Sequence, residues 1–343
     1  MRRNWKIFRQ IREKYTSFLH SRNARAFRFR HSFAGMEITA AGLRAVRMEK
    51  RKKRWCLAAC SEIPFPLGPL HFSYADPGIA DREDVGEVIL QTAEALGGYA
   101  GRAGLSLPNE CIRIFVREFA CLPETEEETE KMIRWWMEKS LRISPDNSLI
   151  SWHLLGKNEK NRENVLIAVA SRDTICAWEM LFKACGIDPE RIRPSGIDQF
   201  HYFCGEIPEE ERIAYIAFPD RFLSLMMIQE GQPLYYQCIR IDSPSFLLHH
   251  LETLYENYLE QYAGMPAGSG PDLVCLAEPE QGMGNLMAEL KEMLCGNIRV
   301  LSGLRMENLC PGSEGGSSCS DQMPAAYSAA AGAALGLTLR GGK

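Results

Sequence analysis

A chain of 343 residues, of which 45% are hydrophobic and 24% charged, has the composition of an ordinary globular protein and is long enough for two domains. It has neither the roughly 18–20 apolar residues of a membrane-spanning helix nor the apolar core of a secretory signal, so we expect a cytoplasmic protein. The net charge of −4 conceals an asymmetry. Residues 1–33 carry ten basic and one acidic side chains, a balance of +9, whereas the other 310 carry 30 and 43, a balance of −13. The acidic body argues against nucleic-acid binding.

The twelve cysteines are interpreted as small core residues. None forms a C-x-x-C pair, and no histidines accompany them at the spacing of metal ligands, so we expect no metal site. Most lie in apolar runs, which is typical of proteins in a reducing compartment.

Residues 1–22 have the pattern of a basic amphipathic helix within an N-terminal arm, 1–33. Arg2 and Arg9 belong to its basic side. Its apolar face consists of Trp5, Phe8, Ile11, Tyr15 and Phe18. Such a helix suits an anionic membrane surface or a partner groove. The alternatives are that the apolar face packs on the body of the protein or that the arm is disordered.

The next part of the chain predicts a small sheet. Residues 34–48 predict two strands around the turn in "GMEITAAGLRAV" (35–46), and residues 54–65 predict a third. A helix is expected at about 83–97, ended by a Gly-Gly pair. A short strand follows at 104–108.

Residues 104–188 have the order β-α-β-β-α of a small α+β insert. Its first strand, 111–119, alternates, with Ile112, Ile114 and Val116 in one register. An acidic helix opened by Pro123 follows. The later elements are strands at 148–156 and 164–171 and a helix at 174–186.

Residues 193–338 predict a second group of strands and helices. The strands are expected at 212–218, 222–241 (a hairpin turning at 230–232) and 273–277. The helices are expected at 244–262, 283–295 and in the terminal "AAYSAAAGAALGL" (325–337). Between the last two helices, residues 311–323 are expected to form a flexible loop.

This arrangement over about 34–338 resembles the PilM family of type IV pilus assembly proteins, within the actin-like ATPase superfamily, and is also similar to MshI and the cytoplasmic domain of GspL. The resemblance implies an α/β, actin-like (ribonuclease H-like) two-lobed fold with a small α+β insert. The implied division is a first lobe at 34–103, completed by 189–212 and 324–338, an insert at 104–188 and a second lobe at 213–310.

The resemblance also locates a nucleotide site, which this sequence fits poorly. In the first phosphate loop Glu37 stands at the place of the family's acid and Arg44 at that of its lysine, but Thr39 replaces a glycine. With Gly42 these residues form a vestigial phosphate loop. In the second loop Pro219 replaces glycine and has no N–H to donate.

The adenosine-side Gly-Gly of the family is here Ala277-Glu278-Pro279. We therefore expect no nucleotide hydrolysis, because phosphoryl transfer depends on positioned phosphates and metal ions. We also expect no bound cofactor. The alternative is an active nucleotide-binding ATPase that uses ATP and Mg²⁺, for which Glu37, Arg44 and Asp220 are the remaining support.

The resemblance implies that a groove beside the insert binds the short cytoplasmic tail of a PilN-type inner-membrane protein. Ile112, Ile114 and Val116 would form one wall, and the helix with Trp135 and Trp136 another. Adjacent residues of a helix do not share a face, so at least one tryptophan should be partly exposed. The implied role is a scaffold of a type IV pilus, type II secretion or MSHA-type machine, peripheral to the inner face of the cytoplasmic membrane, with self-association left open.

Overall fold

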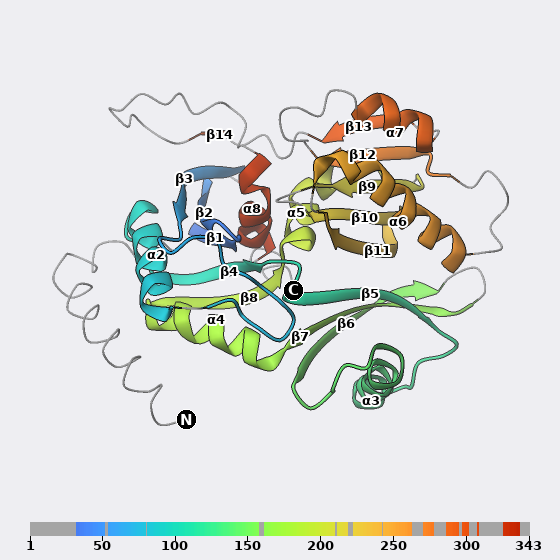
Figure 1. Cartoon of the computed structure of the whole chain (residues 1–343), viewed down its shortest axis with the longest axis horizontal. Helices are drawn as coiled ribbons and strands as arrows, with labels where there is room; N and C mark the ends of the chain where they lie inside the picture. The colour runs from blue at the N-terminus through green and yellow to red at the C-terminus, as the bar shows by residue number, and fades with distance from the viewer. Residues whose placement is uncertain are drawn as a thin grey trace. The chain divides into compact units, whose positions relative to one another are not determined.

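The computed structural model describes residues 32–51, 54–79, 81–157, 161–209, 211–218, 222–241, 243–262, 270–277, 286–294, 297–301, 307–308 and 325–336 (Figure 1). The chain divides into two compact units. Unit 1 comprises the described parts of Met1–Cys111, Asp173–Tyr202 and Gly303–Lys343. Unit 2 comprises the described parts of Ile112–Arg172 and Phe203–Ser302.

A mixed six-stranded sheet forms the centre of unit 1, with the order β14-β3-β2-β1-β4-β8. Its strands are β1 (Ser32–Ile38), β2 (Gly42–Arg51), β3 (Arg54–Pro64), β4 (Gly101–Leu107), β8 (Ile187–Pro194) and β14 (Glu307–Asn308). The first three strands are antiparallel, as the sequence predicted, whereas β4 runs parallel to β1 and β8 parallel to β4.

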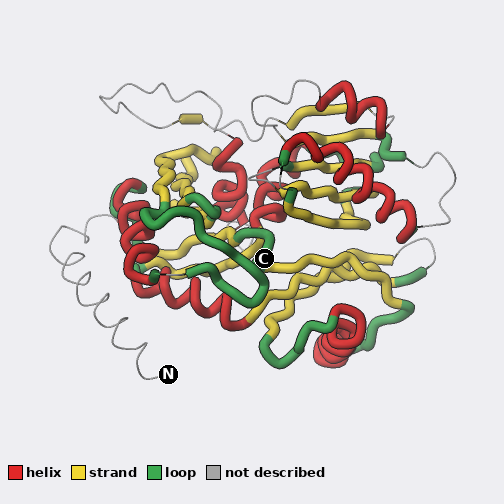
Figure 2. The backbone as a smooth tube through the Cα atoms, viewed as in Figure 1, coloured by secondary structure: helices red, strands yellow, loops and turns green. Residues whose placement is uncertain are grey.

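The helices described in unit 1 are α2 (Arg82–Ala95), α4 (Arg172–Ala184), α5 (Ser195–Phe203) and α8 (Ser328–Gly336); helices are drawn in red in Figure 2. The Asp81 carboxylate begins α2 by accepting hydrogen bonds from the backbone N–H groups of Glu83 and Asp84. Gly97, at φ +85°, follows its end, so the predicted Gly-Gly stop is confirmed.

Helix α8 packs unusually closely on β1 and β4. A Cβ atom added to Gly35 would lie 1.8 Å from the backbone oxygen of Ala330, and one added to Gly104 would lie 2.1 Å from that of Ala333. These two glycines are therefore required by the close approach of the helix backbone.

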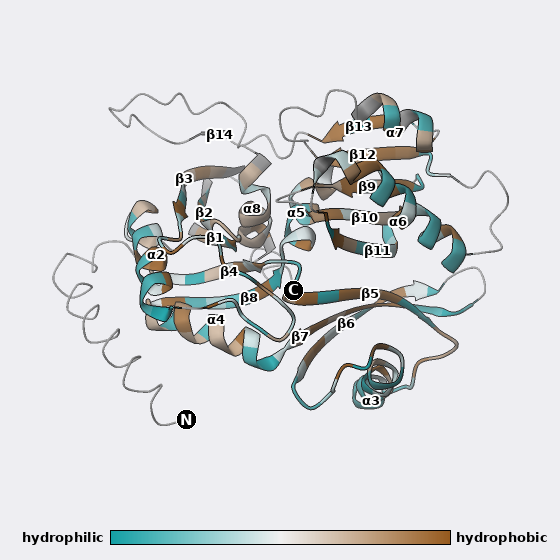
Figure 3. Ribbon diagram, viewed as in Figure 1, coloured by the Kyte–Doolittle hydropathy of each residue, from teal (hydrophilic) through white to brown (hydrophobic). Residues whose placement is uncertain are grey.

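A five-stranded sheet with the order β11-β10-β9-β12-β13 forms one part of unit 2. Its strands are β9 (Ile213–Ala217), β10 (Phe222–Gln229), β11 (Gln232–Arg240), β12 (Leu273–Ala277) and β13 (Asn297–Leu301). Strands β9 and β12 are hydrophobic along their length (Figure 3) and fully buried. Their core is shared with α6 (Leu247–Gln261) and α7 (Leu286–Leu294).

A second sheet of unit 2 has three antiparallel strands in the order β5-β7-β6. They are β5 (Ile112–Phe119), β7 (Glu163–Ser171) and β6 (Ser148–Lys157), and β5 contacts β11 of the larger sheet. Helix α3 (Glu126–Trp136) packs on this sheet and continues into a π-helical turn, Met137–Leu141.

The boundaries of the units differ from the expected insert at 104–188 and second lobe at 213–310. Strand β4 pairs with β1, and β8 extends the same sheet, so both belong with α4 to unit 1. The part of the insert that lies in unit 2 is thereby reduced to Ile112–Arg172. The short strand β14 also pairs with β3 of unit 1.

The strands β8, β13 and β14 and the helix α5 were not predicted. The sequence of β8, IDPERIRP, contains two prolines and several charges, which is atypical of a strand inside a sheet. Helix α3 begins at Glu126, later than expected from Pro123, because the Thr125 hydroxyl caps it. None of the helices in the described part of the chain is both long and apolar enough to cross a membrane.

Candidate functional site

The turn between β1 and β2, the expected first phosphate loop, is closed by its own hydrogen bonds. The Thr39 hydroxyl accepts a bond from the Gly42 N–H and donates one to the Gly42 carbonyl, both at 3.0 Å. The Thr39 N–H donates to the same carbonyl at 2.9 Å. An anion cradle needs backbone N–H groups aimed outward, and here the Gly42 N–H already has an acceptor.

Gly42 itself is explained by packing. A Cβ at this position would lie 2.3 Å from the backbone oxygen of Ile63 on β3. The turn also accepts backbone hydrogen bonds from Phe65 at Ala41 and from Leu70 at Ala40. Glycine is therefore required here by the neighbouring strand, without reference to a phosphate.

Glu37 and Arg44, the two charged residues of the expected site, lie opposite each other on β1 and β2. Arg44 also lies opposite Glu62 on β3, and its Nε donates to Glu62 Oε1 at 2.9 Å. Glu37 is buried and the Arg44 side chain is 14% exposed. Arg44 thus lies between acidic residues of its two neighbouring strands and bonds the carboxylate of Glu62, a cross-strand pair that stabilises the sheet.

The other expected nucleotide elements are only partly described. Ala217 ends β9 as a buried residue and Ala277 ends β12 in the same way. Pro219, Asp220 and Glu278 lie outside the described residues, as do the arm residues Trp5, Phe8, Ile11, Tyr15, Phe18, Arg2 and Arg9 and the loop 311–323. In the described part of the chain, no three His, Cys, Asp or Glu side chains are close enough to hold a metal ion.

The two neighbouring tryptophans of α3 have opposite environments, as the helical spacing required. Trp136 is 8% exposed and packs edge-on against Phe115 and Phe119 of β5, with ring centroids 5.7 and 6.4 Å away. The Arg117 guanidinium lies over its ring at 5.7 Å. Trp135 is 62% exposed.

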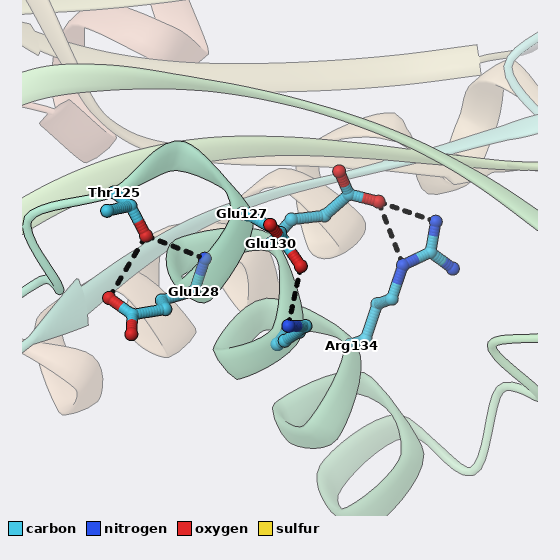
Figure 4. Close-up of polar contacts among 6 residues, drawn as sticks. Thr125, Glu127, Glu128, Glu130 and Arg134 are labelled. Atoms are coloured by element: carbon cyan, nitrogen blue, oxygen red, sulfur yellow. Dashed lines mark hydrogen bonds and ion pairs between the residues drawn. The ribbon is translucent and has the colours of Figure 1, made fainter.

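The surface of α3 around Trp135 is otherwise polar (Figure 4). Glu127 pairs with Lys131, and Glu130 accepts from both Nε and Nη2 of Arg134. The Thr125 hydroxyl accepts from the Glu128 N–H, which caps α3, and donates to the Glu128 carboxylate. Trp135 is therefore a large apolar side chain on a helix face whose charges are already paired.

The three residues expected on β5 lie on the face opposite to Trp136. Ile112 and Val116 are buried, and Ile114 is half-buried. Their register on one face agrees with the predicted alternation. Ile114 and Trp135 are consequently the accessible members of the expected partner-binding set.

A buried polar cluster in unit 1 was missed by the sequence reasoning. Asp198 of α5 is fully buried and forms a short ion pair with Arg193 of β8. Burial raises the pKa of Asp198 to about 7, although Arg193 and the Ser106 hydroxyl act in the opposite direction. Ser106 lies beside Glu37 in the parallel pairing of β4 with β1.

His201 lies one turn further along α5. Its burial, reinforced by the positive charges of Arg193 and Arg191, lowers its pKa to about 4. The only sequence signal for this cluster was an aspartate within the apolar run GIDQFHYF. Because Arg193 also donates to the Gly332 carbonyl at 3.1 Å, the cluster connects β8, α5 and α8, which indicates a structural role.

No family model and no curated protein matches this sequence, but solved structures do. A chain of the "PilM-PilN type IV pilus biogenesis complex" is 16% identical, with a TM-score of 0.69, over 88% of this chain and 97% of that one. A Bacteroides thetaiotaomicron protein described as having an actin-like ATPase fold and unknown function is 12% identical, with a TM-score of 0.49, over 79% and 91%. The ethanolamine utilization protein EutJ from Carboxydothermus hydrogenoformans is 8% identical, with a TM-score of 0.43, over 89% of each chain.

At these low identities the likeness shows the fold alone. The first of the three structures is the one that establishes it. It extends over most of both chains. The α/β, actin-like fold expected from the sequence is confirmed, and so is the resemblance in structure to PilM.

Proposed function

We propose that this protein is a cytoplasmic scaffold of a type IV pilus assembly machine, or of a related type II secretion or MSHA-type machine, and that it binds the short cytoplasmic tail of a PilN-type inner-membrane protein. The observation that carries the proposal is the shared fold with a chain solved in a PilM–PilN complex, over 88% of this sequence. The fold alone is compatible with many functions, so the proposal needs a surface and a test.

Trp135 is the proposed contact for this tail, because Ile114 lies on the face of the sheet turned away from α3. Trp135 offers a large exposed aromatic surface, which is typical of residues that dominate the binding energy of an interface. Ile112, Val116 and Trp136 are buried, so their role would be to support the exposed residues.

We further propose that the nucleotide site is a remnant without ATPase activity. In the Thr39–Gly42 turn, the Thr39 hydroxyl accepts the hydrogen bond from the Gly42 N–H that a phosphate oxygen would have to accept. Arg44 bonds Glu62, a carboxylate that would have to be displaced before a phosphate could bind. Both features favour a structural hairpin over a catalytic one.

The partner proposal is tested by fluorescence anisotropy with a labelled peptide that carries the cytoplasmic tail of a PilN-type protein. We expect Trp135→Ala to weaken binding about tenfold or more, because exposed aromatic anchors contribute over about 1 kcal/mol. The matched control is Phe246→Ala, which removes another exposed aromatic of unit 2, 55% exposed, and should leave the affinity unchanged. Absence of peptide binding by the unmodified protein would refute the proposal.

The nucleotide proposal is tested by thermal unfolding with and without Mg-ATP. A ligand that binds only the folded protein raises its melting temperature as the ligand concentration increases. We expect no rise in the millimolar range. A rise that depends on both Mg²⁺ and ATP would establish the alternative, an active nucleotide-binding protein.

We also propose that the basic arm contacts the anionic inner face of the cytoplasmic membrane. Its +9 charge and its aromatic residues support this proposal. Co-sedimentation with vesicles rich in anionic lipid should lose most bound protein when residues 1–30 are removed. Equal pelleting of the two proteins would exclude the tether.

A further inference from the structure

The outer edge of β6 is an open edge of the three-stranded sheet. Strand β7 occupies one side of β6, and no strand in the described part of the chain pairs with the other side. Such an edge presents a row of backbone N–H and C=O groups that can extend the sheet.

The composition of β6 favours pairing with another strand, because β6 lacks the residues that usually prevent such pairing. Natural edge strands are usually short or carry charges and prolines that discourage association. Strand β6 has ten residues, and its first eight, SLISWHLL, include no proline, lysine, arginine or carboxylate. Leu154 is 44% exposed, and Trp152 is only partly buried.

The aromatic anchor of helix α3 packs at the other edge of this sheet. This buried anchor, Trp136, contacts Phe115 and Phe119, which belong to β5 at the opposite edge. An added strand beside β6 would supply neighbours on both faces.

The polarity of β6 is nearly symmetric about Trp152. Reading outward from this residue, Ser151 matches His153, Ile150 matches Leu154, and then Leu149 matches Leu155. An antiparallel copy of the strand centred on Trp152 would place Ser151 beside His153 and Ile150 beside Leu154. A bulge after Leu154 limits the regular strand at one end and so favours a single register.

We propose that two copies of this protein associate through antiparallel pairing of their β6 strands about a two-fold axis at Trp152. The two three-stranded sheets then form one continuous sheet of order β5-β7-β6-β6-β7-β5. The contact is isologous, because each Ser151 faces the His153 of the other copy. This inference does not depend on the proposed pilus function.

Sedimentation equilibrium of the full-length chain, from about 1 to 100 µM, tests the pairing, because a weak dimer is visible in this range. The variant S151K/H153K places two pairs of ammonium groups opposite each other, and S151E/H153E does the same with carboxylates. Each variant alone should raise the dimer dissociation constant about tenfold or more. An equimolar mixture should restore it, because opposite charges then face each other.

The matched control is S245K/H249K, which changes the same two residue types at exposed positions elsewhere in unit 2. It should dimerise like the unmodified protein. The pairing would be overturned by a monomeric wild-type protein, by a lysine variant that dimerises normally, or by a mixture that stays monomeric. It would equally be overturned if β6 amides gained hydrogen-exchange protection only on adding the PilN-type tail, since the edge would then serve that partner.

Discussion

Arg193 and Asp198 form an ion pair in the interior of unit 1, at the point where β8 passes into α5. Asp198 is fully buried, and the Arg193 side chain is 19% exposed. Arg193 also donates to the Gly332 carbonyl of α8. A Cβ on Gly332 would lie 1.7 Å from the backbone oxygen of Asp198, so the two helices meet at this pair. The stability of unit 1 should therefore respond to the protonation of Asp198.

The first prediction concerns that protonation. Burial raises the pKa of Asp198 from 3.8 to about 7, so between these values the folded protein binds the proton more tightly than the unfolded chain. Its contribution to the free energy of unfolding is present below about pH 4 and is lost as the pH rises to about 7. Measured by urea denaturation, the stability difference between wild type and Asp198→Asn should fall over this range. A difference that stays constant or grows would contradict the prediction.

His201 should produce the opposite slope. Burial lowers its pKa from 6.5 to about 4, so between these values the unfolded chain binds the proton more tightly. Its contribution to stability is present above about pH 6.5 and is lost as the pH falls towards 4. The stability difference between wild type and His201→Gln should therefore grow from about pH 4.5 to 7. The contributions of Asp198 and His201 to stability depend on pH with opposite slopes, so each is revealed only by comparing the wild type with the corresponding single variant. For His201→Gln, a stability difference that falls as the pH rises would refute this assignment.

The third prediction concerns the close packing of α8. Gly35→Ala places a methyl group 1.8 Å from the Ala330 carbonyl oxygen, a backbone atom that cannot move alone. We expect a loss of about 3 kcal/mol or more in the free energy of unfolding, as for severe overpacking. Gly205→Ala is the control, because nothing lies within 4 Å of the added atom. Equal stability of the two variants would show that α8 tolerates a wider spacing.

The fourth prediction separates the two tryptophans of α3. Trp136→Ala removes a buried ring from contact with Phe115 and Phe119, and should cost about 3–5 kcal/mol. Trp135→Ala removes an exposed ring and should cost less than about 1 kcal/mol. Chemical denaturation measures both changes. Comparable losses would mean that Trp135 is also part of the core.

Local elements followed from the sequence where one periodic pattern dominated. The Glu-Gly-Gln turn at 230–232 between two apolar runs predicted the β10–β11 hairpin, and in the structure Glu230 and Gly231 both have positive φ. The Gly-Gly pair at 97–98 predicted the end of α2, whereas its Asp81 cap was found only in the structure. Strand β8 was missed because its prolines and charges hide a pairing that only β4 provides.

For the candidate site, the sequence determined that an acid, a threonine, a glycine and an arginine surround one turn, and that Trp135 and Trp136 could not both be buried. Tertiary structure decided that Thr39 closes the turn on itself, that Arg44 bonds Glu62, and that Trp136 is the buried ring. It also decided that the buried Asp198 forms an ion pair with Arg193. The physical reason is the separation along the chain over which each interaction acts. Periodicity and caps act within a few residues, whereas strand pairing, desolvation and the close approach of two backbones depend on segments far apart in the chain.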